Sequence, residues 1–535
     1  MSASVPVEQP VPEPADGVPS PRSAAAPARL SRFGNPPRRP LLQGLLASLM
    51  LLLGGFGAGG VLVRDPLMTN SAVGFWRYGH GHDLAATLMY GGVVLMAWAW
   101  IMLGRGVLAD RVGGRAVLVT SAVWIFPLLF GPPLFTRDIF SYLAQGALPL
   151  HGFDPYAVGP DAMPGILTDN VHYFWQDTPA PYGPLFILIA KGVAALIGTH
   201  IIPGVLLMRL ALLPGLALLV WAVPELSKRM GGRPALALWI VVANPMTVVN
   251  MIGGGHNDLL VVGLLAAGSL LALRRQHVGA ITLVTFAMAV KASAGLALPF
   301  VVLVWAAHLP SGSRTSRILR AGAYGIGVFA VVFGVCTLAA GVDLGWLPAL
   351  SAPSLIVNWM SIPTAIGQIV GGIASLFGAP MQLFITIFRV IGGLLLLVIA
   401  VRQWWAARDG GPDAIRRAGI VLLLAAVMGP ATLPWYVSWG TVLLAMAPWS
   451  RRALQYLVIA SLMLVVVYYP NGEDALYNWG YLAACLALAI LAAVSLVRPD
   501  PLRLGRGARS RPAPEAVPAT PSPPTVAAGA EQRAG

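Results

Sequence analysis

The sequence predicts an all-α polytopic membrane protein: a bundle of about 14 transmembrane helices (12 at the lower bound), with a large outer loop after the third span. Three observations support this fold class. Of the 535 residues, 57% are hydrophobic and only 10% are charged, whereas soluble domains carry roughly 25% charged residues. Long apolar runs recur along the chain, and Lys and Arg are unevenly shared between the connecting segments. A soluble protein is therefore excluded.

The two ends differ in composition from the middle. Residues 1–40 and 499–535 are rich in Pro, Ala and Ser, which predicts disordered tails flanking a transmembrane domain over 41–498. The long polar segment before the first apolar run argues against a cleaved signal peptide. We therefore expect that run to be a retained signal-anchor helix.

The predicted spans follow from runs of about 20 mainly apolar residues. They lie near 41–63, 84–104, 115–134, 201–222, 234–252, 258–274, 277–291, 293–308, 319–341, 381–403, 415–432, 434–449, 453–469 and 479–497. Two further apolar segments, 184–198 and 361–378, are predicted to be interfacial or re-entrant.

The Lys/Arg distribution sets the predicted orientation. With both tails cytoplasmic, 28 of the 35 Lys and Arg residues fall on one side of the membrane. Letting 184–198 span would move the basic segment "SKRMGGR" outside, so we place that helix in the preceding loop. This asymmetry accounts for the pI of about 10.3 without nucleic acid, which is excluded as a partner. We expect a plasma-membrane protein whose chemistry faces outward.

The largest outer loop, 135–183, opens with adjacent charges, Arg137 and Asp138. One interpretation is structural: a helix-end ion pair, or Asp138 capping the following helix. The other is chemical: a carboxylate at the membrane boundary, beside an aromatic loop, acts as a general base on a sugar hydroxyl. The residue pattern leaves both open.

The stretch "GGGHNDLL" is the second concentration of polar residues. His256, Asn257 and Asp258 form either a polar turn with Asp258 as helix cap, or a polar wall for a hydroxylated substrate with a second carboxylate. Two carboxylates and a His also allow a divalent cation, although no metal-ligand spacing is present. We expect no cofactor and no metal.

Three cations fall inside predicted spans, near their outer ends: Arg209, Lys291 and Arg389. Ionisable groups in lipid are costly, so they are functional candidates by default. Few acids are available to pair with them, which favours an anionic ligand such as a lipid-linked phosphate. Lys291 has the alternative of snorkelling to the interface. The aromatic pair Trp435-Tyr436 beside Pro434 is either a sugar-packing surface or part of an interfacial belt.

Three stretches, "RDIFSYLAQGALPLHGFDPYAVGP", "DTPAPYGPLF" and "GGGHNDLL", resemble in order and position the actinobacterial polyprenol-phosphomannose-dependent α(1→6) mannosyltransferases of the GT-C superfamily, closest to the MptB type. The resemblance covers about 40–497. It implies a multi-pass GT-C fold, an outward-facing site, a polyprenyl-phosphomannose donor and a mannosylated phosphatidylinositol-type acceptor in lipomannan and lipoarabinomannan assembly. The usual paired acids are replaced here by Arg-Asp, which leaves Asp258 or Asp154 as the second acid.

The resemblance implies an inverting transfer in which Asp138 is the general base. The predicted substrate-binding residues are Arg137, Tyr142, Asp154, Tyr156, Tyr182, His256, Asn257, Asp258, Trp435 and Tyr436, and the predicted donor-phosphate residues are Lys291, Arg389 and Arg209. Two alternatives remain: a polyprenyl-linked glycolipid transporter or flippase, and a GT-C enzyme that uses another sugar. The gathering of charges toward the outer half favours the enzyme.

Overall fold

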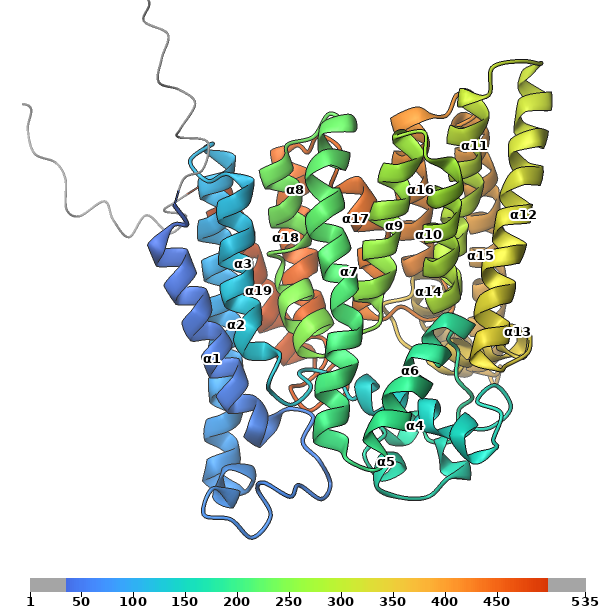
Figure 1. The fold of residues 1–535 in the computed structure, drawn as a ribbon. Coiled ribbons are helices and arrows are strands. Elements are labelled where there is room, and N and C mark those ends of the chain that lie inside the picture. The colour runs from blue at the N-terminus through green and yellow to red at the C-terminus, as the bar shows by residue number, and fades with distance from the viewer. Residues whose placement is uncertain (1–34, 499–535) are drawn as a thin grey trace, which may run out of the picture.

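The computed structural model describes residues 35–498, and this part of the chain is built of helices and connecting turns. Figure 1 shows the long helices side by side in one bundle, with the short helices α4, α5, α6 and α13 gathered at one end. Within 35–498 the only strand-like pairing is an isolated bridge between Tyr468 and Asp474. The all-α prediction is confirmed. The predicted tails lie outside the described residues except for 35–40, where α1 begins at Arg38.

Each predicted span coincides with helical structure. The bundle helices are α1 (Arg38–Ala58), α2 (Gly79–Leu108), α3 (Gly114–Leu128), α7 (Ile201–Arg229), α8 (Pro234–Val241), the π-helical η5 (Met246–Gly253), α9 (Asp258–Leu273), α10 (His277–Val290), α11 (Leu298–His308), α12 (Arg314–Ala340), α15 (Met381–Ala406), α16 (Gly411–Met428), α17 (Val437–Leu444), α18 (Arg451–Val466) and α19 (Trp479–Val497).

Judged by helix length and composition alone, fewer membrane crossings are found than the 14 predicted. Six described helices are long and apolar enough to cross (α1, α2, α7, α12, α15 and α19), and a seventh is obtained if α8 and η5, bent by 46°, form one span. The predicted count of about 14 is therefore not confirmed. Several of the other helices are shorter, because Gly and Pro interrupt the apolar runs; α17, for example, is preceded by a turn at Pro434.

A layer of shorter elements covers the end of the bundle where α4 lies. It contains α4 (Asp138–Ala147), α5 (Ile166–Asp169), α6 (Pro184–Ile197) and α13 (Trp346–Ala349), while α14 (Ile362–Ser375) packs along α15. The segment predicted to be interfacial, 184–198, is α6. It packs against α4 and lies beside it in Figure 1.

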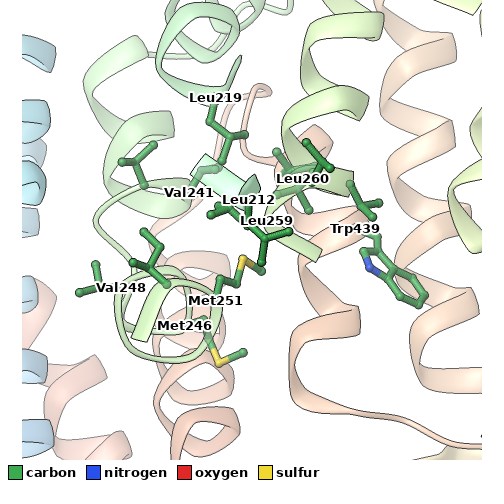
Figure 2. Close-up of a cluster of buried hydrophobic side chains, with 14 of the residues drawn as sticks. Leu212, Leu219, Val241, Met246, Val248, Met251, Leu259, Leu260 and Trp439 are labelled. Carbon is green, nitrogen blue, oxygen red and sulfur yellow. The ribbon is translucent and has the colours of Figure 1, made fainter. Parts of the chain in front are cut away.

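The core fixes α9, which carries part of the site at its first turn. Gly263 on α9 meets Gly215 on α7 so closely that an added Cβ would lie 2.2 Å from the Gly215 carbonyl oxygen. Around this contact α7, α8, η5, α9 and α17 bury an apolar cluster, drawn in Figure 2 with Leu212, Val241, Met251, Leu259 and Trp439 among its members. Close packing of this kind leaves α9 little freedom to move.

Candidate active site

Asp138 is the first residue of α4, and it does not cap that helix from the N-cap position. Its backbone N–H instead donates to Thr136 Oγ1 at 3.1 Å. Just before it, Phe135 takes a left-handed conformation with φ 58°, which turns the chain sharply into α4. The helix dipole stabilises the negative charge of a carboxylate in the first turn. The Asp138 side chain is only partly buried. The Asp138 carboxylate is therefore available for chemistry.

His256 is the closest titratable neighbour of this carboxylate. Its Nδ1 lies 3.4 Å from Asp138 Oδ2, and the ring is fully buried and stacks on Trp435 with centroids 3.6 Å apart. The turn before it requires glycine: Gly255 has φ +78°, and a Cβ there would lie 2.6 Å from Ile139 on α4. The two stretches "GGGHND" and "RDIF" are thus in direct contact.

Opposing effects act on the pKa of Asp138. Burial raises it, but His256 beside the carboxylate lowers it, and Lys291 and His172 lower it further, so that the pKa lies below its ordinary value. At neutral pH Asp138 is therefore ionised, which is the form that accepts a proton.

Asp258 lies two residues after His256, and its carboxylate accepts hydrogen bonds from two partners. Its Oδ2 accepts from Lys291 Nζ at 2.7 Å, and its Oδ1 accepts from Trp439 Nε1 at 2.5 Å. Asp258 is fully buried, and the Lys291 ammonium also lies 4.6 Å from the centre of the Tyr436 ring. A buried charge needs such a partner, so Asp258 holds Lys291 in place.

Two cavities meet at Asp138, and their walls share Asp138, Trp175, Leu433 and Trp435. The smaller, of about 130 Å³, is lined also by Lys291, Tyr182, Tyr436 and Trp439. The larger, of about 250 Å³, is lined also by Arg137, His172, Tyr468, Glu473 and Tyr477. We call them the lysine cavity and the glutamate cavity. One carboxylate thus faces two neighbouring spaces of different chemistry.

One face of α4 supplies polar groups to the lysine cavity. Asp138, Ser141 and Gln145 are spaced at i, i+3 and i+7, so they lie along the same side of the helix. Ser141 Oγ and Gln145 Oε1 are buried without a hydrogen-bond partner in the described structure. Buried polar atoms are normally paired, so these two are suited to a hydroxylated ligand.

The glutamate cavity has carboxylates and aromatic rings in its wall. Glu473 Oε2 lies 3.5 Å from His172 Nε2, and Asp474 lies next to it on the same rim. Tyr477 and Trp175 add flat apolar surface. Carboxylate acceptors beside aromatic faces are a suitable lining for a neutral sugar.

Arg137 does not form the expected ion pair with Asp138. Its guanidinium donates to the carbonyl of Asn170 at 2.9 and 3.1 Å and to that of Val61 at 3.1 Å. It therefore joins the outer loop to the segment after α1. The helix-end ion pair considered from the sequence is wrong, although Arg137 still lines the glutamate cavity.

Two of the three cations predicted to bind the donor phosphate already donate hydrogen bonds within the protein, mainly to backbone carbonyls. Arg209 donates to Leu129, Gly131, Pro132 and Gly253 at 2.5 to 3.1 Å and lines neither cavity. Arg389 donates to Thr364 Oγ1 and to the carbonyls of Ser354 and Ile356 at 2.6 to 2.9 Å. Arg209 thereby fixes the segment that leads into α4, and Arg389 fixes a wall of the glutamate cavity. Only Lys291 of the three faces a cavity beside Asp138.

The other predicted residues divide between the site and its surroundings. Tyr182, Trp435 and Tyr436 line the lysine cavity, while Tyr142 packs edge-on against Tyr182 with ring centres 5.3 Å apart. Asn257 is fully buried, and neither atom of its amide has a partner in the described structure.

Two predicted residues of the outer loop lie away from both cavities. Asp154 is exposed, and its Oδ1 accepts from the backbone N–H of Tyr156 at 2.9 Å in a local turn. Tyr156 is buried in a separate apolar cluster with Phe333 and Trp346. The structure thus brings neither Asp154 nor Asp258 to Asp138 as a free second acid.

Sequence reasoning missed several residues that line the cavities, among them Ser141, Gln145, Trp175, Trp439, His172 and Glu473. The i, i+3, i+7 spacing behind Asp138 could have indicated Ser141 and Gln145. No sequence pattern links Glu473 to His172, which is 301 positions earlier in the chain. Across residues 35–498, no group of three or more His, Cys, Asp or Glu is arranged to hold a metal ion.

Comparison with known proteins gives two family matches. The model "alpha-(1→6)-mannopyranosyltransferase, N-terminal domain" matches residues 41–307, and the model "MptB C-terminal domain" matches residues 363–498. Asp138 falls in the first matched region and Glu473 in the second, so both regions contribute walls to the glutamate cavity.

Named relatives match over most of their length. Alpha-(1→6)-mannopyranosyltransferase A of Mycobacterium tuberculosis is 40% identical, covering 88% of this chain and 93% of the relative. The protein of the same name in Corynebacterium glutamicum is 31% identical, covering 83% and 96%. Alpha-(1→6)-mannopyranosyltransferase B of C. glutamicum is 29% identical, covering 77% and 73%. No solved structure matches the chain.

Proposed function

The chain belongs to the MptA/MptB family of alpha-(1→6)-mannopyranosyltransferases and is a mannosyltransferase with membrane-type helices, and we propose that it moves mannose from polyprenyl-phosphomannose to a growing α(1→6) mannan. The proposed acceptor is a mannosylated phosphatidylinositol-type glycolipid, and the proposed role is lipomannan and lipoarabinomannan assembly. One observation carries the proposal: Asp138 lies where the lysine cavity and the glutamate cavity meet.

The lysine cavity is the proposed donor site. The lipid-linked donor brings a phosphate, and Lys291 is the cation in this cavity's wall. As the bond between mannose C1 and the phosphate oxygen breaks, negative charge grows on the phosphate, and a nearby ammonium stabilises it. Ser141 and Gln145, whose buried oxygens have no partner, face the same space and provide hydrogen bonds for the mannose hydroxyls.

The glutamate cavity is the proposed acceptor site. Its carboxylates, Glu473 and Asp474, accept hydrogen bonds from sugar hydroxyls, and its aromatic rings pack against the apolar faces of a sugar. A mannoside placed there directs its reacting hydroxyl toward Asp138, because Asp138 is in the wall that this cavity shares with the donor site.

The proposed reaction is a single displacement. Asp138 takes the proton of the acceptor 6-hydroxyl while that oxygen bonds to mannose C1, and polyprenyl phosphate leaves with the electron pair of the broken C1–O bond. The attacking oxygen and the leaving phosphate are on opposite faces of C1, so a β-linked donor gives an α-linked product. The side-chain arrangement supports this scheme because base and cation line the same cavity.

The proposed location is the plasma membrane, with both termini cytoplasmic and the site extracytoplasmic. The Lys/Arg asymmetry supports this orientation. We assign no metal to the reaction, since Lys291 is placed to act on the leaving phosphate. We prefer the enzyme to the flippase alternative because a candidate base, Asp138, and a cation, Lys291, line the same cavity.

The experiment that tests this function is a membrane assay with labelled polyprenyl-phosphomannose and short α(1→6) mannosides, with and without EDTA. We expect labelled mannose to be added in an α(1→6) linkage, unaffected by EDTA. If label passes only from polyprenyl-phosphoglucose or -arabinose, the proposed sugar is wrong. If the donor lipid crosses the membrane without transfer, the enzyme mechanism is wrong.

A further inference from the structure

A cavity of about 820 Å³ lies at the end of the bundle away from α4 and α6. Its lining comes from the end of α2, the loop after it, the start of α8, the start of α18 and the end of α19. It shares no lining residue with the two cavities at Asp138. The proposed mannosyl transfer makes no use of it.

Four arginines line this cavity: Arg105, Arg111, Arg233 and Arg451. Among the ion pairs of residues 35–498, only Arg233 of these four takes part, with Asp110, whose side chain is exposed. Four like charges around one space repel each other unless an anion lies between them. The arrangement therefore has an excess of positive charge facing an open volume.

Of the four arginines, Arg105 gives the strongest indication of a bound anion. Its Nε donates to the Ser495 carbonyl at 2.6 Å, which anchors the guanidinium between α2 and α19. Its Nη2 is buried and has no hydrogen-bond partner in the described structure. A buried charged donor without a partner is costly, so the site is suited to an acceptor that the chain itself does not supply.

The rest of the wall is apolar. Met102, Leu236 and Leu454 line it together with Trp449, and Trp is a residue type that favours the boundary between lipid and water. A ligand with an anionic head and an apolar body matches this pairing, whereas a free anion would leave the apolar wall unused. The segment after residue 498 is not a suitable occupant of the cavity. It carries five Arg and three acidic residues, so its net charge is positive, like that of the cavity.

We propose that this cavity binds the headgroup of an anionic glycerophospholipid from the leaflet at that end of the bundle. The phosphate is bound between Arg105, Arg111, Arg233 and Arg451, and the first part of the acyl chains lies on the apolar wall. Arginine suits this role because its planar guanidinium binds phosphate oxygens in pairs. Such a lipid ties α2, α8, α18 and α19 together at the end opposite the site.

The test titrates the full-length protein in detergent with dioctanoyl-phosphatidylglycerol, and in parallel with dioctanoyl-phosphatidylcholine and with inorganic phosphate. Binding is followed by native mass spectrometry and by the rise in melting temperature. The pocket variant is Arg111→Gln/Arg451→Gln. The matched control is Arg275→Gln/Arg452→Gln, which removes the same charge from arginines that do not line the cavity.

We expect the wild-type protein to prefer phosphatidylglycerol, and the pocket variant to bind it about 25-fold more weakly, since each of the two arginines near an anionic lipid contributes about five-fold. The control variant keeps wild-type affinity. Equal weakening in both variants, or unchanged binding in the pocket variant, overturns the proposal. Inorganic phosphate binding as tightly as the lipid also overturns it, in favour of a free-anion site.

A second variant guards against misfolding. Ala447→Glu places a carboxylate in the cavity lining while keeping all four arginines. If the arginine variant gives no cooperative melting transition, Ala447→Glu decides: loss of phosphatidylglycerol binding supports the proposal, and wild-type binding contradicts it.

Discussion

The Nζ of Lys291 lies 2.7 Å from Oδ2 of Asp258, and this buried ion pair forms a wall of the cavity that Asp138 also lines. Lys291 follows the last turn of α10, and Asp258 is the first residue of α9. The pair thus positions a cation beside the candidate base while neutralising it within the bundle. It also explains why Asp258, a candidate second acid in the sequence, is not free to act as one.

The first prediction separates the structural from the chemical role of this pair. Lys291→Met leaves the charge of Asp258 buried without a cation beside it, which destabilises the protein by about 3–5 kcal/mol. Lys291→Met/Asp258→Asn removes both charges, so most of that stability returns, whereas mannosyl transfer stays lost. Thermal unfolding in detergent and transfer rates in membranes measure the two effects. Full activity in the double variant would show that the cation has no part in the reaction.

The second prediction concerns pH. His256 is a principal cause of the lowered pKa of Asp138. In the wild-type protein the carboxylate is ionised above the ordinary pKa of an Asp and is protonated only below it. Transfer therefore persists at mildly acidic pH, as does the stability contributed by the ionised group. In His256→Gln the acid limb of kcat/KM moves to higher pH. An unchanged acid limb would mean that another group controls it.

The third prediction tests the acceptor site. Glu473→Gln weakens hydrogen bonds from sugar hydroxyls to a charged acceptor, which raises the acceptor KM about 10- to 100-fold and leaves the donor KM unchanged. Asp154→Asn is the matched control, because Asp154 is an exposed acid of the outer loop that lines neither cavity. A rise in donor KM instead would place the donor in the glutamate cavity.

The fourth prediction concerns Arg209. Its guanidinium serves four carbonyls in the segments that lead to Asp138 and His256, so Arg209→Met lowers the free energy of unfolding by several kcal/mol. Arg209→Lys keeps the charge but cannot reach four carbonyls, and it is destabilised as well. Folded protein of either variant keeps its donor KM. If Lys restores stability and Met raises only the donor KM, Arg209 binds phosphate.

Composition and apolar periodicity were enough to predict the helical membrane fold, and the three quoted motifs were enough to predict the family. The sequence also singled out "RDIF" and "GGGHND" as candidate stretches, but it did not predict the contact between them, where Gly255 approaches Ile139 closely. The number of crossings could not be derived, since hydropathy does not tell a short buried helix from a short span.

The partners of individual charges could not be predicted from the sequence. Arg137 and Asp138 are neighbours in the chain, but one turns to the carbonyls of Asn170 and Val61 and the other to His256. Arg209 and Arg389 have no acid near them, which suggested a phosphate, whereas backbone carbonyls satisfy them. Carbonyls that irregular turns leave free do not show in a residue pattern.

The most direct test of the central claim is the rate of mannosyl transfer in Asp138→Asn membranes at matched protein level. Asn keeps the size of the side chain and its place beside His256 but cannot accept the proton. We predict that transfer from polyprenyl-phosphomannose falls by roughly 10²- to 10⁴-fold while the protein accumulates normally and still binds donor. Wild-type turnover in this variant would contradict the account, because Asp138 would then not be the base.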